Sequence, residues 1–238
     1  MSSGSGVRSV AKEDEVELAK VAGPWEVSFP NGFSPNATAK GADEIVAFDK
    51  LISWTDRPEA GVKYFSGIAT YRCKIGGRGT GKWEGGRWIR LRQGFVGQAG
   101  GRVFLDLGEV RELAEVMVNG KKFDPLWHPP FRVDITDVVA TMPSSSPLDL
   151  QIRVANLWAN RLIGDDQTCP PDCEWVGEVR RGVKELGIKE IPQWLKAGLQ
   201  SPTGRHTFTT WKHWDKNDGL LPSGLLGPVR IVVRKKGH

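Results

Sequence analysis

The sequence lacks the long apolar run that a membrane-spanning helix requires. No stretch of about 20 consecutive apolar residues occurs among its 238 residues. No apolar segment typical of a secretory signal peptide follows Met1. We therefore expect a soluble chain without a membrane partner.

An excess of charge of one sign is also missing. The chain has 33 Lys and Arg against 28 Asp and Glu, which gives a formal net charge of +5, and the two signs are interleaved along the sequence. A nucleic-acid-binding surface needs clustered cations. The sequence therefore argues against a nucleic-acid partner.

Cysteine is scarce. The sequence has three cysteines, which are too few for a disulfide framework. Cys73 alternates within an apolar pattern and is predicted to be a small buried hydrophobe. Cys169 and Cys173, in CPPDC, could form a bridge or stay free. A zinc site is not favoured, because no further ligands follow at a suitable spacing.

Strict alternation of apolar and polar residues is abundant instead, and it is typical of half-buried antiparallel strands. Asn119-Gly120 ends one such segment and suits a tight hairpin turn. We predict an all-β, jelly-roll-like antiparallel β-sandwich. The alternating inward positions are Trp25, Val27, Phe29, Tyr71, Cys73, Val103, Leu105, Leu107, Ala114, Val116, Val118, Phe131, Val133, Ile135, Leu148, Leu150, Ile152, Val154, Val229, Ile231 and Val233.

No linker divides the chain, so we predict a flexible tail at 1–22 and a single domain at 23–238. Ordered structure is expected to begin at Gly23-Pro24. The glycine-rich segment 76–86 is predicted to be a hairpin tip or insertion, followed by a strand in WIRLR. It lacks the GK[ST] ending of a phosphate-binding loop.

A long excursion, residues 159–224, separates the last two strands. Trp175, Val179, Val183 and Leu186 recur at helical spacing and predict a helix over 174–186. A second helical turn is expected around 191–195, with Gly198 after it. Excursions of this length are normally functional or form an interaction surface.

The root of this excursion carries the candidate sugar site. Trp158 follows a strand and offers a stacking face, while Asn160, Arg161 and Asp165 offer donors and acceptors for vicinal hydroxyls. Chain continuity should bring Trp211 and His213 back toward the same rim. The alternative is that Arg161 and Asp165 pair to hold the loop, and both interpretations stay open.

A catalytic interpretation rests on a second set of residues. His206 and His213, with carboxylates nearby in the sequence, are the ingredients of an acid/base site. Loop carboxylates of this kind are more often solvated, or they hold a structural calcium ion. No GxSxG or HExxH motif occurs. The carboxylates are Asp165, Asp166, Asp215 and Asp218.

Several segments together resemble a known family. They are GPWEVSF, YFSGIATYRCKI, LWHPPFRVDIT, IRVANLWANRLIGD and TFTTWKHWDKNDGLLPSGLLGPVRI. Over residues 23–235 the chain resembles the galactose-binding-like β-sandwich, or sugar-binding domain, of bacterial glycoside hydrolases. It is most similar to family 106 α-L-rhamnosidases and more distantly similar to family 2 enzymes. The glycine-rich insertion departs from that pattern.

The resemblance implies an ancillary module that is not an enzyme by itself, because those enzymes carry their catalytic carboxylates on a separate barrel. It implies binding of plant or algal polysaccharide sugars without a cofactor, and a bacterial parent protein that is secreted or periplasmic. In family 2 enzymes the loop after the strand equivalent to 148–156 reaches the active site of the neighbouring barrel. The alternatives are a domain that docks a separate catalytic barrel without binding free sugar, and a small hydrolase.

Overall fold

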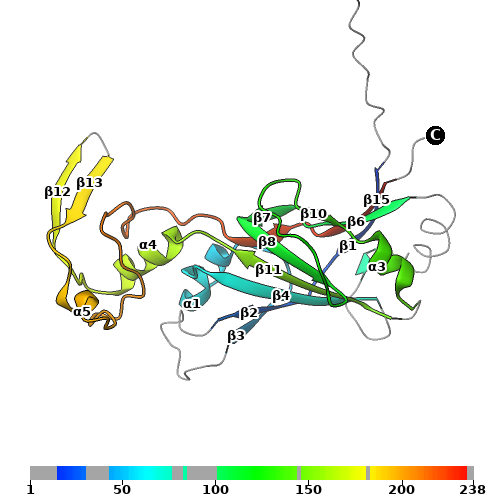
Figure 1. Cartoon of the computed structure of the whole chain (residues 1–238), viewed down its shortest axis with the longest axis horizontal. Helices are drawn as coiled ribbons and strands as arrows, with labels where there is room; N and C mark the ends of the chain where they lie inside the picture. Colours follow the sequence, from blue (N-terminus) through cyan, green and yellow to red (C-terminus); the bar gives the residue numbers. More distant parts are fainter. Residues whose placement is uncertain are drawn as a thin grey trace, which may run out of the picture.

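A computed structural model describes residues 15–30, 43–76, 83–84, 101–143, 146–180 and 183–234. Two antiparallel sheets pack against each other around one apolar core, and an elongated extension leaves one end (Figure 1). This arrangement confirms the predicted all-β sandwich. Among the described residues, no helix is both long and apolar enough to cross a membrane.

The larger sheet has six described strands, in the order β3-β2-β4-β11-β8-β9, and the other has five, in the order β10-β6-β15-β1-β5. In the six-stranded sheet the bounds are β3 (Glu44–Phe48), β2 (Trp25–Phe29), β4 (Ile68–Ile75), β11 (Leu148–Ala155), β8 (Leu113–Val118) and β9 (Lys121–Lys122). In the five-stranded sheet they are β10 (Arg132–Asp134), β6 (Arg102–Asp106), β15 (Arg230–Arg234), β1 (Glu15–Val21) and β5 (Trp83–Glu84).

Two short pairs and five helical segments complete the described structure. β14 (Gly224–Gly227) pairs with β7 (Glu109–Arg111), and β12 (Trp175–Arg180) pairs with β13 (Val183–Ile188). The helical segments are η1 (Trp54–Asp56), α1 (Ala60–Lys63), α3 (Thr136–Thr141), α4 (Ala159–Thr168) and α5 (Gln193–Lys196).

Alternation along β11 places this strand at the centre of the sandwich. Its inward side chains have no exposed surface, and it pairs with β4 on one side and β8 on the other. Asn119 and Gly120 have φ values of 49° and 81°, which confirms the hairpin turn between β8 and β9. The buried side chains of β11 are Leu148, Leu150, Ile152 and Val154.

Aromatic side chains fill the part of the core next to the extension. The hydroxyl of Tyr71 accepts a hydrogen bond from Trp54 Nε1 at 2.5 Å and from the backbone N–H of Leu225 at 3.1 Å. Cys73 lies in the same strand and is buried, as predicted. Burial, and then the charge of Asp149, raise the pKa of this thiol to about 11, so it stays protonated at neutral pH.

The predicted tail is too long, because β1 is the strand between β15 and β5. The carboxylate of Glu15 accepts hydrogen bonds from Arg132 at 2.8 Å and Arg234 at 2.9 Å, which fixes the start of this strand to its sheet. Periodicity did not reveal β1, because its alternation changes phase between Leu18 and Ala19, where the register with β15 shifts. The assignment of 23–238 to one domain stays a prediction. Most of segment 76–86, and the strand expected in WIRLR, lie outside the described residues.

The helix predicted over 174–186 is wrong, because this segment forms the β12-β13 hairpin. Residues four apart share one face of a strand as well as of a helix, so the spacing did not discriminate between the two. Gly177 has a φ of +129°, and a Cβ there would lie 2.0 Å from the Glu185 carbonyl oxygen. The second helical turn is confirmed as α5, with Gly198 at a φ of +66°.

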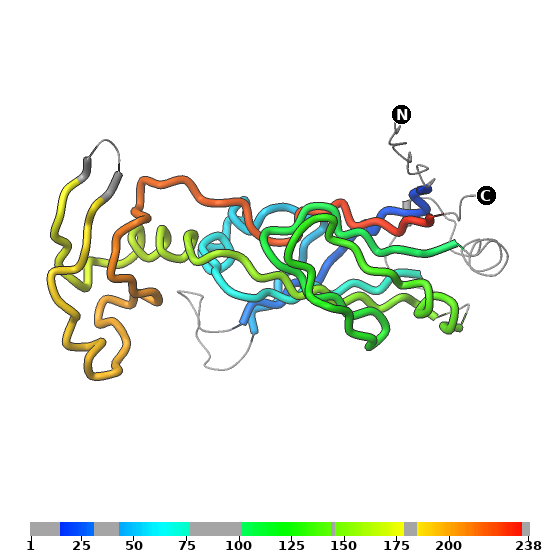
Figure 2. The backbone as a smooth tube through the Cα atoms, turned by 45° about the horizontal axis from the view of Figure 1, so that its top comes forward, coloured from blue at the N-terminus to red at the C-terminus, as the bar shows by residue number. Residues whose placement is uncertain are grey.

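The excursion reaches well beyond the sandwich. α4 leads away from the end of β11, the β12-β13 hairpin and α5 lie at the far end, and the chain returns beside α4 to β14 (Figures 1 and 2). The outgoing and returning segments lie side by side in both views. The excursion is therefore an arm fixed to one end of the sandwich.

Replacing Ile152 by Asp should prevent cooperative folding, because Ile152 has no exposed surface and an unpaired charge would enter the core. Circular dichroism and urea unfolding would measure this. Gln151→Asp is the control, since the neighbouring side chain is on the outer face and should leave folding intact. A soluble Ile152→Asp chain with a normal unfolding transition would contradict the assigned inward face.

Candidate functional site

After β11, Asn156 keeps one backbone hydrogen bond, from its N–H to the carbonyl oxygen of Gly67 at 3.2 Å, and adds side-chain hydrogen bonds. Its Nδ2 donates to the carbonyl oxygen of Phe65 at 2.9 Å, and its Oδ1 accepts from the backbone N–H of Gly67, also at 2.9 Å. Alternation stops here, and α4 begins three residues later. Asn156, the first residue of NLWANRLIGD, therefore fixes the direction in which α4 leaves the sheet.

Asn160 joins both ends of the excursion. Its Nδ2 donates to the Leu221 carbonyl oxygen at 2.8 Å and to Ser223 Oγ at 2.9 Å, and its Oδ1 accepts from the Leu221 backbone N–H at 2.8 Å. Ser223 in turn donates its backbone N–H to Ser53 Oγ at 3.0 Å. Asn160 is 1% exposed, so these bonds close the root of the excursion away from water.

Asp165 lies one helical turn after Arg161, and their buried ion pair is the centre of the site. Arg161 donates from Nε at 2.9 Å and from Nη2 at 2.6 Å to Oδ1 of Asp165. The other oxygen, Oδ2, accepts from the backbone N–H of His206 at 2.9 Å and from Thr207, through N–H at 2.8 Å and Oγ1 at 2.7 Å. We call Asp165 with Arg161, His206 and Thr207 the Asp165 clamp.

Asp166 extends this attachment on the neighbouring face of α4. Its carboxylate lies 3.5 Å from Arg205 Nη1 and 3.3 Å from Lys212 Nζ, and it accepts the backbone N–H of Lys216 at 3.0 Å. Gln167 accepts from the Tyr64 hydroxyl at 2.6 Å and donates to the Lys216 carbonyl oxygen at 3.0 Å. The returning segment is thus bonded to α4 at successive positions.

The structure corrects the expected role of three candidate residues. Asn160, Arg161 and Asp165 are between 0% and 2% exposed and bond other parts of the protein, so they cannot contact a sugar in this arrangement. The alternative interpretation, an Arg161–Asp165 pair that holds the loop, describes the observed geometry. These residues position the excursion.

The other three candidates are exposed but do not meet at one point. Trp158 is 56% exposed and lies at the start of α4, next to the sandwich. Trp211 is 44% exposed and forms a bridge with Gly187 of the hairpin, and the next residue, Lys212, reaches Asp166. Positions 158 and 166 are eight residues apart along α4, which is about 12 Å along the helix axis. One sugar unit therefore does not span both.

Trp211 and His213 do lie together. Their ring centroids are 6.1 Å apart and the ring planes meet at 33°, on an exposed surface of the excursion. A Trp face can stack on the apolar face of a sugar ring, and an imidazole can donate or accept a hydrogen bond. The role of Trp158, Trp211 and His213 in sugar binding stays a prediction.

Three carboxylates of the acid/base set accept hydrogen bonds from within the protein. Asp165 and Asp166 accept hydrogen bonds from the returning segment, as described above. Asp218 accepts a hydrogen bond from the backbone N–H of Asp215 at 2.7 Å within a turn. Partial burial, and then the Arg161 guanidinium, lower the pKa of His206, which keeps its imidazole neutral at pH 7. The geometry therefore offers no pair of carboxylates facing across a cleft in this part of the described structure.

Metal binding finds no support in the arrangement of the described residues. Among them, no three His, Cys, Asp or Glu side chains gather as metal ligands would. A structural calcium ion at the loop carboxylates stays untested. Cys169 and Cys173 are free thiols in this structure.

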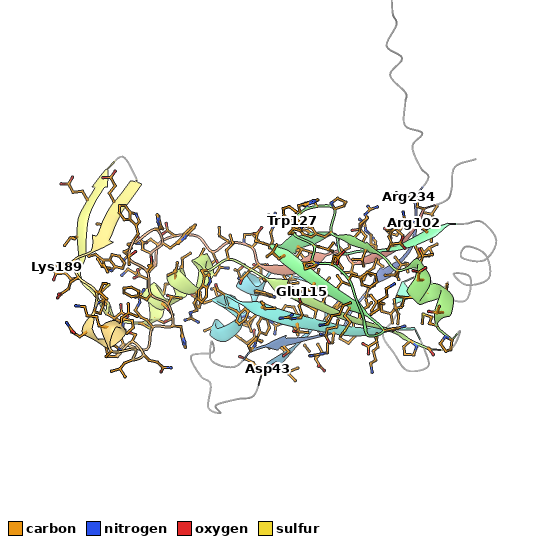
Figure 3. All side chains as sticks on the ribbon, viewed as in Figure 1. Asp43, Arg102, Glu115, Trp127, Lys189 and Arg234 are labelled. Carbon is orange, nitrogen blue, oxygen red and sulfur yellow. The ribbon has the colours of Figure 1, made fainter. Side chains whose placement is uncertain are left out.

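Trp127 is an exposed aromatic residue that the sequence pattern did not single out. It is 73% exposed and contacts His128 edge-on, with 5.0 Å between the ring centroids. It lies on the sandwich and not on the excursion (Figure 3). The available signal was its position among prolines in DPLWHPP, outside any alternating strand.

No model of a protein family matches the sequence. The chain is 39% identical over 213 residues to a Formosa agariphila protein described as "Putative beta-glucuronidase", a match that covers 90% of this chain and 15% of that protein. The structure is also similar to that of a rhamnosidase from Novosphingobium sp. PP1Y. That similarity has a TM-score of 0.62 and 28% sequence identity, and it covers 95% of this chain and 16% of the rhamnosidase.

The chain is therefore related to glycoside hydrolases and spans about 15% of the length of these relatives. This confirms the resemblance at the level of glycoside hydrolases. The galactose-binding-like family and the assignment to family 106 stay predictions.

Replacing Asp165 by Asn should lower the free energy of unfolding by about 3–5 kcal/mol, because Arg161 would keep a buried charge without its partner. Urea unfolding would measure the loss. The matched control is Glu174→Gln, which breaks the exposed Lys189–Glu174 pair and should cost less than about 1 kcal/mol. Equal losses for the two variants would contradict a structural role for the Asp165 clamp.

Proposed function

We propose that this chain is the non-catalytic, ancillary domain of a glycoside hydrolase and that it binds carbohydrate through the exposed aromatic side chains of its excursion. The observation that carries this proposal is the Asp165 clamp, which holds a projecting segment in a fixed position on the sandwich. Relatives that are glycoside hydrolases over a much longer chain support the ancillary role.

The proposed contact is the pair of Trp211 and His213. Both side chains are exposed, and the backbone that carries them is fixed by the bridge to Gly187 and by the Lys212–Asp166 ion pair. A rigid aromatic side chain loses little conformational entropy when a ligand binds. The position is therefore suited to stacking against a saccharide.

A second candidate function, docking to a catalytic domain without binding free sugar, is favoured by an apolar patch on the sandwich. Ile68 and Leu113 lie on either side of Ala155 in the strand register, and both are more than 40% exposed. Leu157 and Trp158 continue this patch along the chain and are more than half exposed. Contiguous exposed apolar side chains are typical of interaction surfaces.

The chain alone should not hydrolyse aryl α-L-rhamnosides, β-D-glucuronides or β-D-galactosides above background. The physical reason is that Asp165 and Asp166, the carboxylates nearest the candidate site, are held by internal donors and cations. Release of the aryl group would be measured by absorbance, with an active glycosidase as the positive control. Hydrolysis that disappears in Asp166→Asn would establish an enzyme instead.

Replacing Trp211 by Ala should weaken binding of rhamnose- or galactose-containing oligosaccharides by roughly tenfold, since stacking contributes about 1 kcal/mol or more beyond area burial and 1.4 kcal/mol is a factor of ten. Calorimetric titration would measure the dissociation constant at this site. Trp127→Ala is the matched control, because that exposed Trp lies on the sandwich. Absence of heat with every oligosaccharide, from a folded chain, would leave docking as the better account.

A further inference from the structure

The outer face of the six-stranded sheet carries two adjoining cavities. One, of about 700 Å³, lies over β3, β2, β4 and β11, and the other, of about 480 Å³, lies over β11, β8 and the segment after β9. Gln151 of β11 lines both cavities, so the two adjoin at this residue, and together we call them the groove. Cavities of this size are typical of small-ligand sites.

The strand register explains the direction of this groove. Directly opposed residues form one row that crosses all six strands, and Arg72 and Gln151 lie at its centre. Neighbouring strands are about 4.8 Å apart, so the row is roughly 24 Å long. A ligand along it would be extended and would cross the strands. The row is Ala47, Glu26, Arg72, Gln151, Met117 and Lys122.

The groove presents polar groups that the described structure leaves available. Arg72, Lys74 and Gln151 make no side-chain hydrogen bond or ion pair with another described residue. A guanidinium and an ammonium donate, and an amide both donates and accepts, which is the combination that hydroxyl groups require. Among the described residues that line the groove, Arg153 and Glu115, on its β8 side, are the pair bonded to each other.

The charges of the lining indicate the class of ligand. Four cationic side chains lie among three anionic ones, so the groove is nearly neutral. A polyanion such as a nucleic acid would require an excess of cations. The charged residues are Glu26, Arg72, Lys74, Glu115, Lys122, Asp149 and Arg153.

Apolar side chains lie between these polar groups. Ile45 is 62% exposed and, with Ala47, lines one end of the groove, while Met117, Phe123 and Pro125 line the other. Sugar rings have apolar C–H faces and polar edges, and they can use both kinds of surface. A strongly apolar or strongly charged ligand would use only one.

We infer that this groove binds a neutral oligosaccharide, extended across the strands, with Arg72 and Gln151 as its central hydrogen-bonding residues. The inference takes the ligand class from the proposed function, but it places the ligand on a different surface. Glu115 marks the sandwich and Lys189 marks the far end of the excursion, well apart from it (Figure 3). The groove and the Trp211–His213 pair are therefore separate sites.

The test uses the full chain carrying Trp211→Ala, so that binding at the excursion does not contribute. Neutral galactose-, xylose- and rhamnose-containing oligosaccharides of about six units, and their monosaccharides, are titrated by calorimetry. We expect at least one oligosaccharide to bind at least tenfold more tightly than its monosaccharide. Adding Arg72→Ala or Gln151→Ala should weaken that binding about tenfold or more, with melting unchanged because both side chains face outward.

Thr70→Ala is the matched control, because Thr70 lies on the same face of β4 in the next row and lines neither cavity. It should leave affinity unchanged. Equal affinity in the Arg72, Gln151 and Thr70 variants would overturn the groove, as would binding confined to acidic oligosaccharides or no heat at all. Binding that Trp211→Ala alone abolishes would overturn the groove while leaving the proposed function intact.

Discussion

The carboxylate of Asp165 is removed from water, and the arrangement of the excursion depends on it. It accepts five hydrogen bonds, two from Arg161 in its own helix and three from the returning segment at His206 and Thr207. A buried charge without such donors would cost several kcal/mol. Any displacement of the returning segment would remove three of them. The main effect of the clamp is therefore to specify one position for the excursion, and its net contribution to the free energy of unfolding is smaller than its number of hydrogen bonds suggests.

The sandwich supplies the buried core of the molecule, and the excursion supplies exposed aromatic side chains. The sandwich buries its apolar residues in one core. α4 continues from the sandwich, and hydrogen bonds of Asn160 and Asp165 fix the returning segment to it. The excursion can therefore expose Trp211 and His213 without burying much apolar surface of its own. The outer face of the six-stranded sheet, supported by the same core, is left free to carry a groove. The groove lies on strands, and the Trp211–His213 pair lies on a segment bonded to the β12-β13 hairpin and to α4.

Alternation predicted the sandwich well, because β11, β8 and β4 are buried on one face only, and their apolar residues therefore recur at every second position. The same reasoning failed at 174–186, since residues four apart coincide on a helix and on a strand, and Gly177 alone carried the backbone signal. Three of the six candidate residues, Asn160, Arg161 and Asp165, are buried and position the excursion, whereas sugar binding by the other three stays a prediction. Arg161 and Asp165 have the chemistry to bind a sugar or each other, and only the approach of Thr207, distant in sequence, decides between the two. The sequence did not predict the groove, because Arg72 and Gln151 are aligned by the pairing of β4 with β11, two strands that are far apart in the sequence.

The central claim is that the excursion is a fixed part of the folded domain, and native-state hydrogen exchange of the unmodified chain tests it most directly. The backbone N–H groups of Thr207 and Leu221 donate to side chains of α4, whereas those of β11 donate within the sheet core. If the clamp fixes the excursion, Thr207 and Leu221 should exchange with an opening free energy close to that of Ile152. Exchange of Thr207 and Leu221 at the rate of an unprotected peptide, while Ile152 stays protected, would contradict the account.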